Sequence, residues 1–175
     1  VKERLCNVGA AEFLLPQSQV SDFLDSEGVS VRHIETLANR FSASRLATAI
    51  QIADCARHRC IMVVATRMPD RTPDFPRLIE LEEPNRLPLL VEYSMPSRTT
   101  KYGVGRYAPI RARSIVAMAE DAPHGEVLNA PDLVPFKSGR RWEVDTEAVR
   151  LGSRVYVLFN LEAPQPINDG QLSLF

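Results

Sequence analysis

The segment from Ser94 to Arg113 carries several cationic side chains and no acid. Aromatic and glycine residues, Tyr102 and Tyr107 among them, are interleaved with these cations. A loop of this composition suits a phosphate, an anionic small molecule or single-stranded nucleic acid. The residues expected to contact such a ligand are Arg98, Lys101, Tyr102, Arg106 and Arg111. A solvated surface loop that balances the acidic run at 80–83 is the alternative, and the sequence leaves both interpretations open.

The cysteines and histidines offer little for metal binding or nucleophilic catalysis. The pattern Cys55-x-x-His58-x-Cys60 has no fourth ligand at a suitable spacing, whereas a structural zinc site usually has four. Cys55 is therefore expected in the core of a helix and Cys60 at the start of a strand. His33 and His124 have no visible partner for nucleophilic catalysis.

The C-terminal residues form a candidate docking tail. A segment with two prolines and a glycine, residues 162–170, reads as a linker and precedes an exposed apolar end. The pentapeptide 171–175, Gln-Leu-Ser-Leu-Phe, resembles the bacterial sliding-clamp-binding motif at all its positions. The residues expected to bind the clamp are Gln171, Leu172, Leu174 and Phe175. The alternative is a tail that folds back on its own domain.

The first residues predict a short helix with one face of small side chains, ended by Pro16. A packed helix needs a partner, no earlier residues supply one, and the chain has no initiator Met. We therefore expect the chain to be the C-terminal part of a longer protein. The segment Glu3-Arg4-x-x-Asn7-x-x-Ala-Ala-Glu-x-Leu-x-Pro16 resembles the conserved helix of the ImmA/IrrE-type zinc metalloendopeptidases, and Gly9 departs from the larger apolar residue usual there.

The resemblance implies a metal site of which this chain holds one part. In that family a His-Glu-x-x-His helix precedes the segment, and the resemblance makes Glu3 the third zinc ligand. These 175 residues contain no His-Glu-x-x-His. Zinc is thus expected in the full-length protein only, and this chain alone is expected to be inactive. By the resemblance, such stress-response peptidases cleave a repressor-type protein.

Composition narrows the class of protein further. The net charge is −1, and the sequence pI is about 6.4. A globally basic nucleic-acid binder is therefore excluded, although a local basic patch is not. No apolar run approaches the roughly 20 residues of a membrane span. We expect a cytoplasmic protein.

The N-terminal half predicts helices and a helix-turn-helix-like unit. A helix is expected over 17–27, another over Arg32 to Phe41 with an apolar stripe, and a third after Ser44 to about Ala56. Its expected inward residues are Leu46, Ala49, Ile50 and Ala53, and its outward ones, placed to read bases, are Arg45, Thr48 and Gln51. Few cations are available for phosphate contacts, so a scaffold role is favoured over DNA binding.

The second half predicts a mixed α/β module. Strands are expected at 60–65, 77–83, 87–93, 141–146 and 154–161, with a proline-rich loop at 69–76 and a helix at 113–120. The layout is similar to the GAF-like, sensor-type domain of some family members. The predicted fold class is α+β.

Three parts are expected along the chain. Residues 1–58 hold the end of a peptidase-like domain and the helix-turn-helix unit, 59–162 the GAF-like domain, and 163–175 the linker and tail. One hypothesis is the C-terminal portion of a regulatory zinc metalloendopeptidase that cleaves a repressor-type protein. The other is a non-enzymatic DNA- or sliding-clamp-binding module with a ligand-sensing domain.

Overall fold

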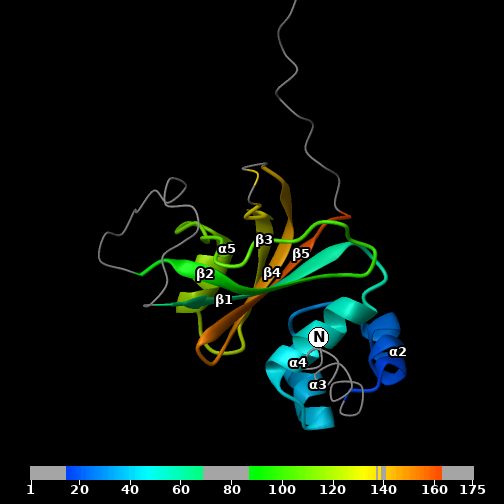
Figure 1. Cartoon of the computed structure of the whole chain (residues 1–175). Coiled ribbons are helices and arrows are strands. Elements are labelled where there is room, and N and C mark those ends of the chain that lie inside the picture. The colour runs from blue at the N-terminus through cyan, green and yellow to red at the C-terminus, as the bar shows by residue number, and fades with distance from the viewer. Residues whose placement is uncertain (1–14, 69–86, 137, 139–140, 163–175) are drawn as a thin grey trace, which may run out of the picture.

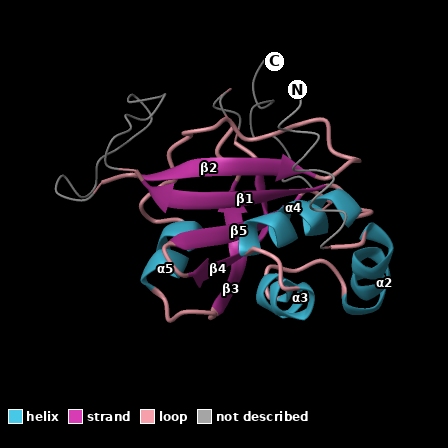
Figure 2. Ribbon diagram, turned by 60° about the horizontal axis from the view of Figure 1, so that its bottom comes forward, coloured by secondary structure: helices cyan, strands magenta, loops and turns pink. Residues whose placement is uncertain are grey.

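The computed structural model describes residues 15–68, 87–136, 138 and 141–162. These residues form one five-stranded antiparallel sheet, in the order β2-β1-β5-β4-β3, with helices on both faces (Figures 1 and 2). The elements are α2 (Gln17–Glu27), α3 (His33–Phe41), α4 (Arg45–Cys55), β1 (Cys60–Arg67), β2 (Leu89–Pro96), α5 (Ile115–Asp121), β3 (Val127–Leu133), β4 (Glu143–Leu151) and β5 (Arg154–Asn160). The predicted α+β class is confirmed.

Local sequence signals begin and end the first three helices, which we call the helical layer. α2 follows Pro16 and ends at Gly28, whose φ of 81° suits a residue without a Cβ. α3 ends at Ser42 in the left-handed region, and Ser44 caps α4 by accepting from the Ala47 N–H at 3.1 Å. The helix predicted over 17–27 is confirmed with the same bounds.

The interior strand β1, between β2 and β5, is buried on both faces of the sheet. Ile61 and Val63 face a cluster that includes α5 and the segment before it, whereas Met62 and Val64 face the helical layer. A run of apolar, β-branched residues without polar alternation is what a strand covered on both sides requires. The strand predicted at 60–65 is confirmed and continues to Arg67.

Pairing between distant segments closes the sheet. β1 pairs with β2 on one side and with β5 on the other, so Cys60 lies opposite Asn160. β4 and β5 form a hairpin, in whose turn Gly152 adopts a φ of 69°. β2 is bordered by loop residues, since Val91 N donates to Ala108 O at 3.0 Å and Ile110 N donates to Leu89 O at 2.9 Å.

One strand was missed by the sequence analysis. β3 carries Asn129, Pro131 and Asp132, residues that disfavour strands, and it lies at the edge of the sheet, where a proline is tolerated. The strand predicted at 77–83 and the loop at 69–76 lie outside the described residues. Within the residues that the structure describes, no helix is long and apolar enough to cross a membrane.

Candidate functional site: a hollow between the helical layer and the sheet

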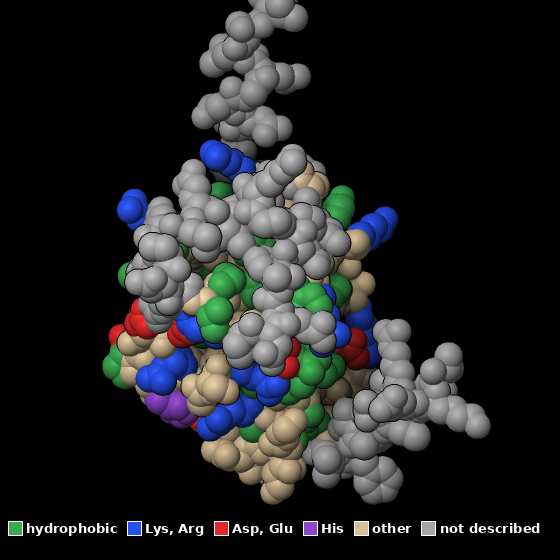
Figure 3. All heavy atoms as spheres, turned by 60° about the vertical axis from the view of Figure 1, so that its left-hand side comes forward, with side chains coloured by type: hydrophobic (Ala, Val, Ile, Leu, Met, Phe, Trp, Pro, Cys, Tyr) green, Lys and Arg blue, Asp and Glu red, His purple; other side chains and the backbone are tan. Residues whose placement is uncertain are grey.

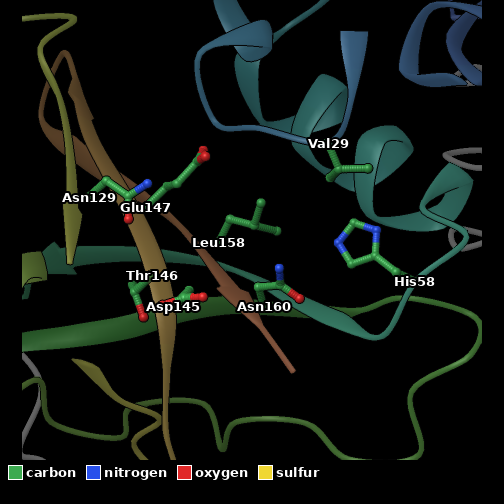
Figure 4. Close-up of a pocket in the computed structure, with 8 residues that line it drawn as sticks. All are labelled: Val29, His58, Asn129, Asp145, Thr146, Glu147, Leu158 and Asn160. Carbon is green, nitrogen blue, oxygen red and sulfur yellow. The ribbon is translucent and has the colours of Figure 1, made fainter. Parts of the chain in front are cut away.

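An open hollow of about 430 Å³ lies where the helical layer stops covering the sheet (Figure 4). Its walls come from the loop before α3 and the loop after α4, and its floor comes from β3, β4 and β5. The lining residues are Val29, His58, Asn129, Asp145, Thr146, Glu147, Leu158 and Asn160. We refer to this set as the hollow.

Glu147 joins the two layers beside the hollow. Its Oε2 accepts a hydrogen bond from Ser30 Oγ at 2.6 Å and another from Val31 N at 3.0 Å. Ser30 Oγ in turn accepts from Arg32 N at 3.3 Å and from Arg32 Nε at 3.2 Å. A carboxylate of β4 therefore holds the loop between α2 and α3 against the sheet.

The remaining polar groups of the hollow are rich in acceptors. Asp145 lies exposed at the rim and directly opposite Asn160 in the β4–β5 register. Asn160 Oδ1 accepts from Glu162 N at 3.2 Å, so its amide nitrogen is the atom left for a ligand. Asn129 lies opposite Glu147 in the β3–β4 register. Buried Leu158 adds an aliphatic surface to the floor.

The sequence analysis did not single out the hollow. The alternation in β4, where exposed Glu143 and Asp145 and half-buried Glu147 are separated by buried residues, indicates that one face carries acids. It does not indicate that the loops holding Val29 and His58 overhang that face. His58 was considered only as part of a metal pattern.

In the structure, two of the predicted anion-binding residues form ion pairs, and the other three are exposed. Arg98 Nε donates to Asp54 Oδ1 of α4 at 3.1 Å, and Arg111 Nη2 donates to Asp132 Oδ1 of β3 at 3.0 Å. These two cations thus have ion-pair partners on different elements. Lys101, Tyr102 and Arg106 are exposed, so they are the part of the predicted site open to a ligand.

The exposed part of this loop has aromatic neighbours. Tyr102, 53% exposed, meets Trp142 edge to face with a centroid distance of 6.2 Å. The Arg106 guanidinium lies 5.0 Å from the Tyr107 ring centroid. On the face shown in Figure 3, Lys and Arg side chains are dispersed among acidic, hydrophobic and uncharged ones.

Asp132 has a structural role that the sequence analysis did not foresee. This carboxylate is 4% exposed and accepts from Ile115 N at 3.0 Å at the start of α5, and from Leu133 N at 2.7 Å. Together with Ser114, whose Oγ accepts from Ala117 N at 3.1 Å, it caps the helix that covers the other face of the sheet.

The prediction of which side of α4 faces outward is wrong. Thr48 is 0% and Gln51 is 5% exposed, whereas Ile50, expected to point inward, is 42% exposed. Thr48 Oγ1 is satisfied inside the helix by donating to Ser44 O at 3.0 Å, which lets a polar residue be buried. Arg45 is paired with Glu35 of α3. The three residues therefore do not share a face that could enter a DNA groove.

The described cysteines and histidines are placed as packing residues. Cys55 and Cys60 are buried. The Cys55 thiol donates to Gln17 O at 3.7 Å, and burial raises the pKa of Cys60 to about 11 despite a hydrogen bond from Ser97 that lowers it. Burial also lowers the pKa of His33, which meets Phe23 edge to face at 5.1 Å. Within the described ranges, no group of three or more His, Cys, Asp or Glu side chains could hold a metal ion.

Two sets of predicted site residues lie outside the described residues. One is Glu3, the expected zinc ligand. The other is the tail Gln171, Leu172, Leu174 and Phe175. Both remain predictions from the sequence.

Comparison with known proteins gives two relatives and no matching family model. The chain is 32% identical over 163 residues to the radiation response metalloprotease IrrE of Deinococcus deserti, covering 93% of the chain and 55% of the relative. It is 27% identical over 167 residues to the protein of the same name from Deinococcus radiodurans, covering 93% of the chain and 49% of the relative. The chain thus spans about half the length of the curated relatives it matches. These similarities support an IrrE/ImmA-type family.

Proposed function

We propose that the chain is the C-terminal portion of an IrrE-type regulatory zinc metalloendopeptidase that cleaves a repressor-type protein, and that the portion alone is inactive. The observation that carries this proposal is the similarity to two metalloproteases over nearly all of the chain but only about half of each relative. The Glu3-Arg4-x-x-Asn7 pattern, which resembles the same family, also supports it.

In this proposal Glu3 is the one zinc ligand that the chain contributes. The other ligands would come from a His-Glu-x-x-His segment of the longer protein, as the family resemblance implies. Zinc held by two histidines and a carboxylate would supply an activated water for peptide hydrolysis. The helical layer and the sheet would support and regulate that site.

The test uses the full-length protein and a repressor-type substrate. Glu3→Gln is expected to abolish cleavage and to lower the bound zinc below one equivalent, because a neutral amide is a poor zinc ligand. Asp22→Asn, a charge removal at an exposed position of α2, is the control and should leave both unchanged. Full cleavage by the Glu3→Gln protein would contradict the ligand assignment.

A ligand-sensing role for the GAF-like part is supported by the basic loop. Lys101, Tyr102 and Arg106 are exposed on a segment anchored by Ser94, whose Oγ accepts from Val104 N at 2.9 Å. An anchored loop can present cations and a ring to an anion without much ordering cost. Arg98 and Arg111 would have to leave their ion pairs to join, so we place them at the edge of such a site.

A partner-docking tail is the second candidate function. Its support is the match of residues 171–175 to the sliding-clamp-binding pattern at every position. We expect the chain to bind a bacterial sliding clamp with micromolar affinity, lost when Leu174 and Phe175 are both replaced by Ala. Calorimetry that detects no binding by the unaltered chain would remove this candidate.

A further inference from the structure

The hollow contains hydrogen-bond acceptors that the protein does not use. Glu147 Oε2 takes both donors from the helical layer, and Glu147 Oε1 accepts no hydrogen bond from any described residue. The carboxylate of Asp145 likewise has no ion pair or hydrogen bond within the described part of the chain. Two carboxylates of one strand, separated by one residue and therefore on one face, are thus available to a ligand (Figure 4).

The surroundings of these carboxylates are mixed rather than simply acidic. Leu158, buried in the floor, and Val29 in the wall provide aliphatic surface, while Asn129 and Asn160 provide carboxamides on neighbouring strands. His58 lies at the opposite wall (Figure 4). The ligand that fits is a donor-rich cation on an aliphatic stem, whose methylenes contact Leu158 and Val29 while its charge meets the carboxylates.

A planar guanidinium satisfies this arrangement better than an ammonium group. It presents five N–H donors in one plane, enough for both carboxylates and the carboxamide oxygen of Asn129, whereas an ammonium has three donors and is more strongly hydrated. We propose that the hollow binds the arginine side chain of a partner polypeptide.

Free arginine is a poorer occupant of the same hollow. Its α-carboxylate would be repelled by Asp145 and Glu147, and its α-ammonium would compete with the guanidinium for the same carboxylates. A residue within a polypeptide carries no such charge. The exposed position of Asp145 at the rim lets a side chain enter while its main chain stays outside.

Occupancy of the hollow would act where the two layers are joined. A cation at Glu147 Oε1 neutralises the carboxylate whose other oxygen holds Ser30 and Val31. That the partner polypeptide is the protein cleaved by the full-length peptidase is a further step, and this step rests on the proposed function. The binding of an arginine side chain at the hollow does not rest on it.

The test measures binding to this chain by nuclear magnetic resonance, with short blocked peptides as probes. An acetylated, amidated Gly-Arg-Gly peptide should shift the backbone signals of the lining residues in a saturable manner at millimolar concentration. The matched peptide with citrulline, which has the same shape without the charge, should bind at least about tenfold more weakly, and the Gly-Lys-Gly peptide and free arginine should each be weaker than the arginine peptide.

Variants assign the effect to the hollow. Asp145→Asn keeps the side-chain shape at an exposed position and should weaken binding of the arginine peptide about fivefold. Asp22→Asn removes the same charge from α2 and should leave binding unchanged. Unaffected binding in Asp145→Asn, or shifts that do not saturate, would overturn the proposal.

The other probes have equally definite consequences. Equal binding of the citrulline peptide would overturn the role of charge, equal binding of the lysine peptide would overturn the choice of guanidinium, and equal or tighter binding of free arginine would overturn the polypeptide source. These binding measurements on this chain need neither zinc nor a cleavage assay. A result that excludes arginine binding at the hollow therefore says nothing about the peptidase proposal, and the converse also holds.

Discussion

Removal of the Glu147 carboxylate is expected to loosen the contact between the helical layer and the sheet. In Glu147→Ala, Ser30 Oγ and Val31 N lose their acceptor, and both residues are buried. A hydrogen bond to a charged group contributes about 1.5–3 kcal/mol, and a buried donor left without a partner costs about 1–3 kcal/mol. Glu147 is only half-buried, so water replaces part of this loss. We expect the free energy of unfolding to fall by about 2 kcal/mol.

Urea unfolding followed by the fluorescence of Trp142, the one tryptophan and a buried one, measures this change. With an m-value of about 2 kcal/mol/M, the midpoint should fall by about 1 M. Glu147→Gln keeps an acceptor oxygen and should lose less than half as much. Glu143→Ala, at an exposed position of the same strand, should change stability by less than about 0.5 kcal/mol. Equal midpoints for Glu147→Ala and Glu143→Ala would refute the reasoning.

Three further changes test other parts of the structure. Burial lowers the pKa of His33 from 6.5, so as the pH falls the unfolded chain takes up the proton before the folded chain does. The free energy of unfolding should therefore keep its full value above about pH 6.5 and decrease below it. His33→Phe should flatten this dependence in unfolding curves between about pH 7 and 5. Asp132→Ala should lower the melting temperature by about 6 °C, for a loss of about 2 kcal/mol, and Asp132→Asn by about half, because an amide still accepts from the start of α5. In a chain with Cys6→Ser and Cys55→Ser, at about pH 8, the remaining thiol of Cys60, whose pKa burial raises to about 11, should react with Ellman's reagent only as fast as the protein unfolds. Immediate release of a full equivalent of colour would contradict this.

Local patterns were enough for the elements whose ends and faces are set by neighbours in the chain. Pro16 and Gly28 bound α2 because proline suits the start of a helix and glycine the positive φ at its end. β1 was recognisable because a strand covered on both faces is apolar without interruption. The stripe of α3, with Ile34 and Leu37 buried, follows from the helical period.

The orientation of α4 shows where local patterns stop. Its apolar residues surround much of the helix, so the period does not determine which side faces inward. Packing against α2 and α3 as well as β1 and β2 decided that side, burying Thr48 and Gln51 and leaving Ile50 exposed. β3 was missed for a related reason, since an edge strand needs only one apolar face and tolerates Pro131.

The candidate sites also differ in whether the sequence alone could identify them. The basic loop at 94–113, the Glu3 pattern and the tail could be identified as candidate sites from the sequence alone, because each consists of residues close together in the chain. Only the tertiary structure could bring Ser30 to Glu147, which is 117 residues away, and place Val29 and His58 over the acids of β4. Such contacts depend on which strands pair and in what register, and that choice minimises the free energy of the whole chain rather than of any segment.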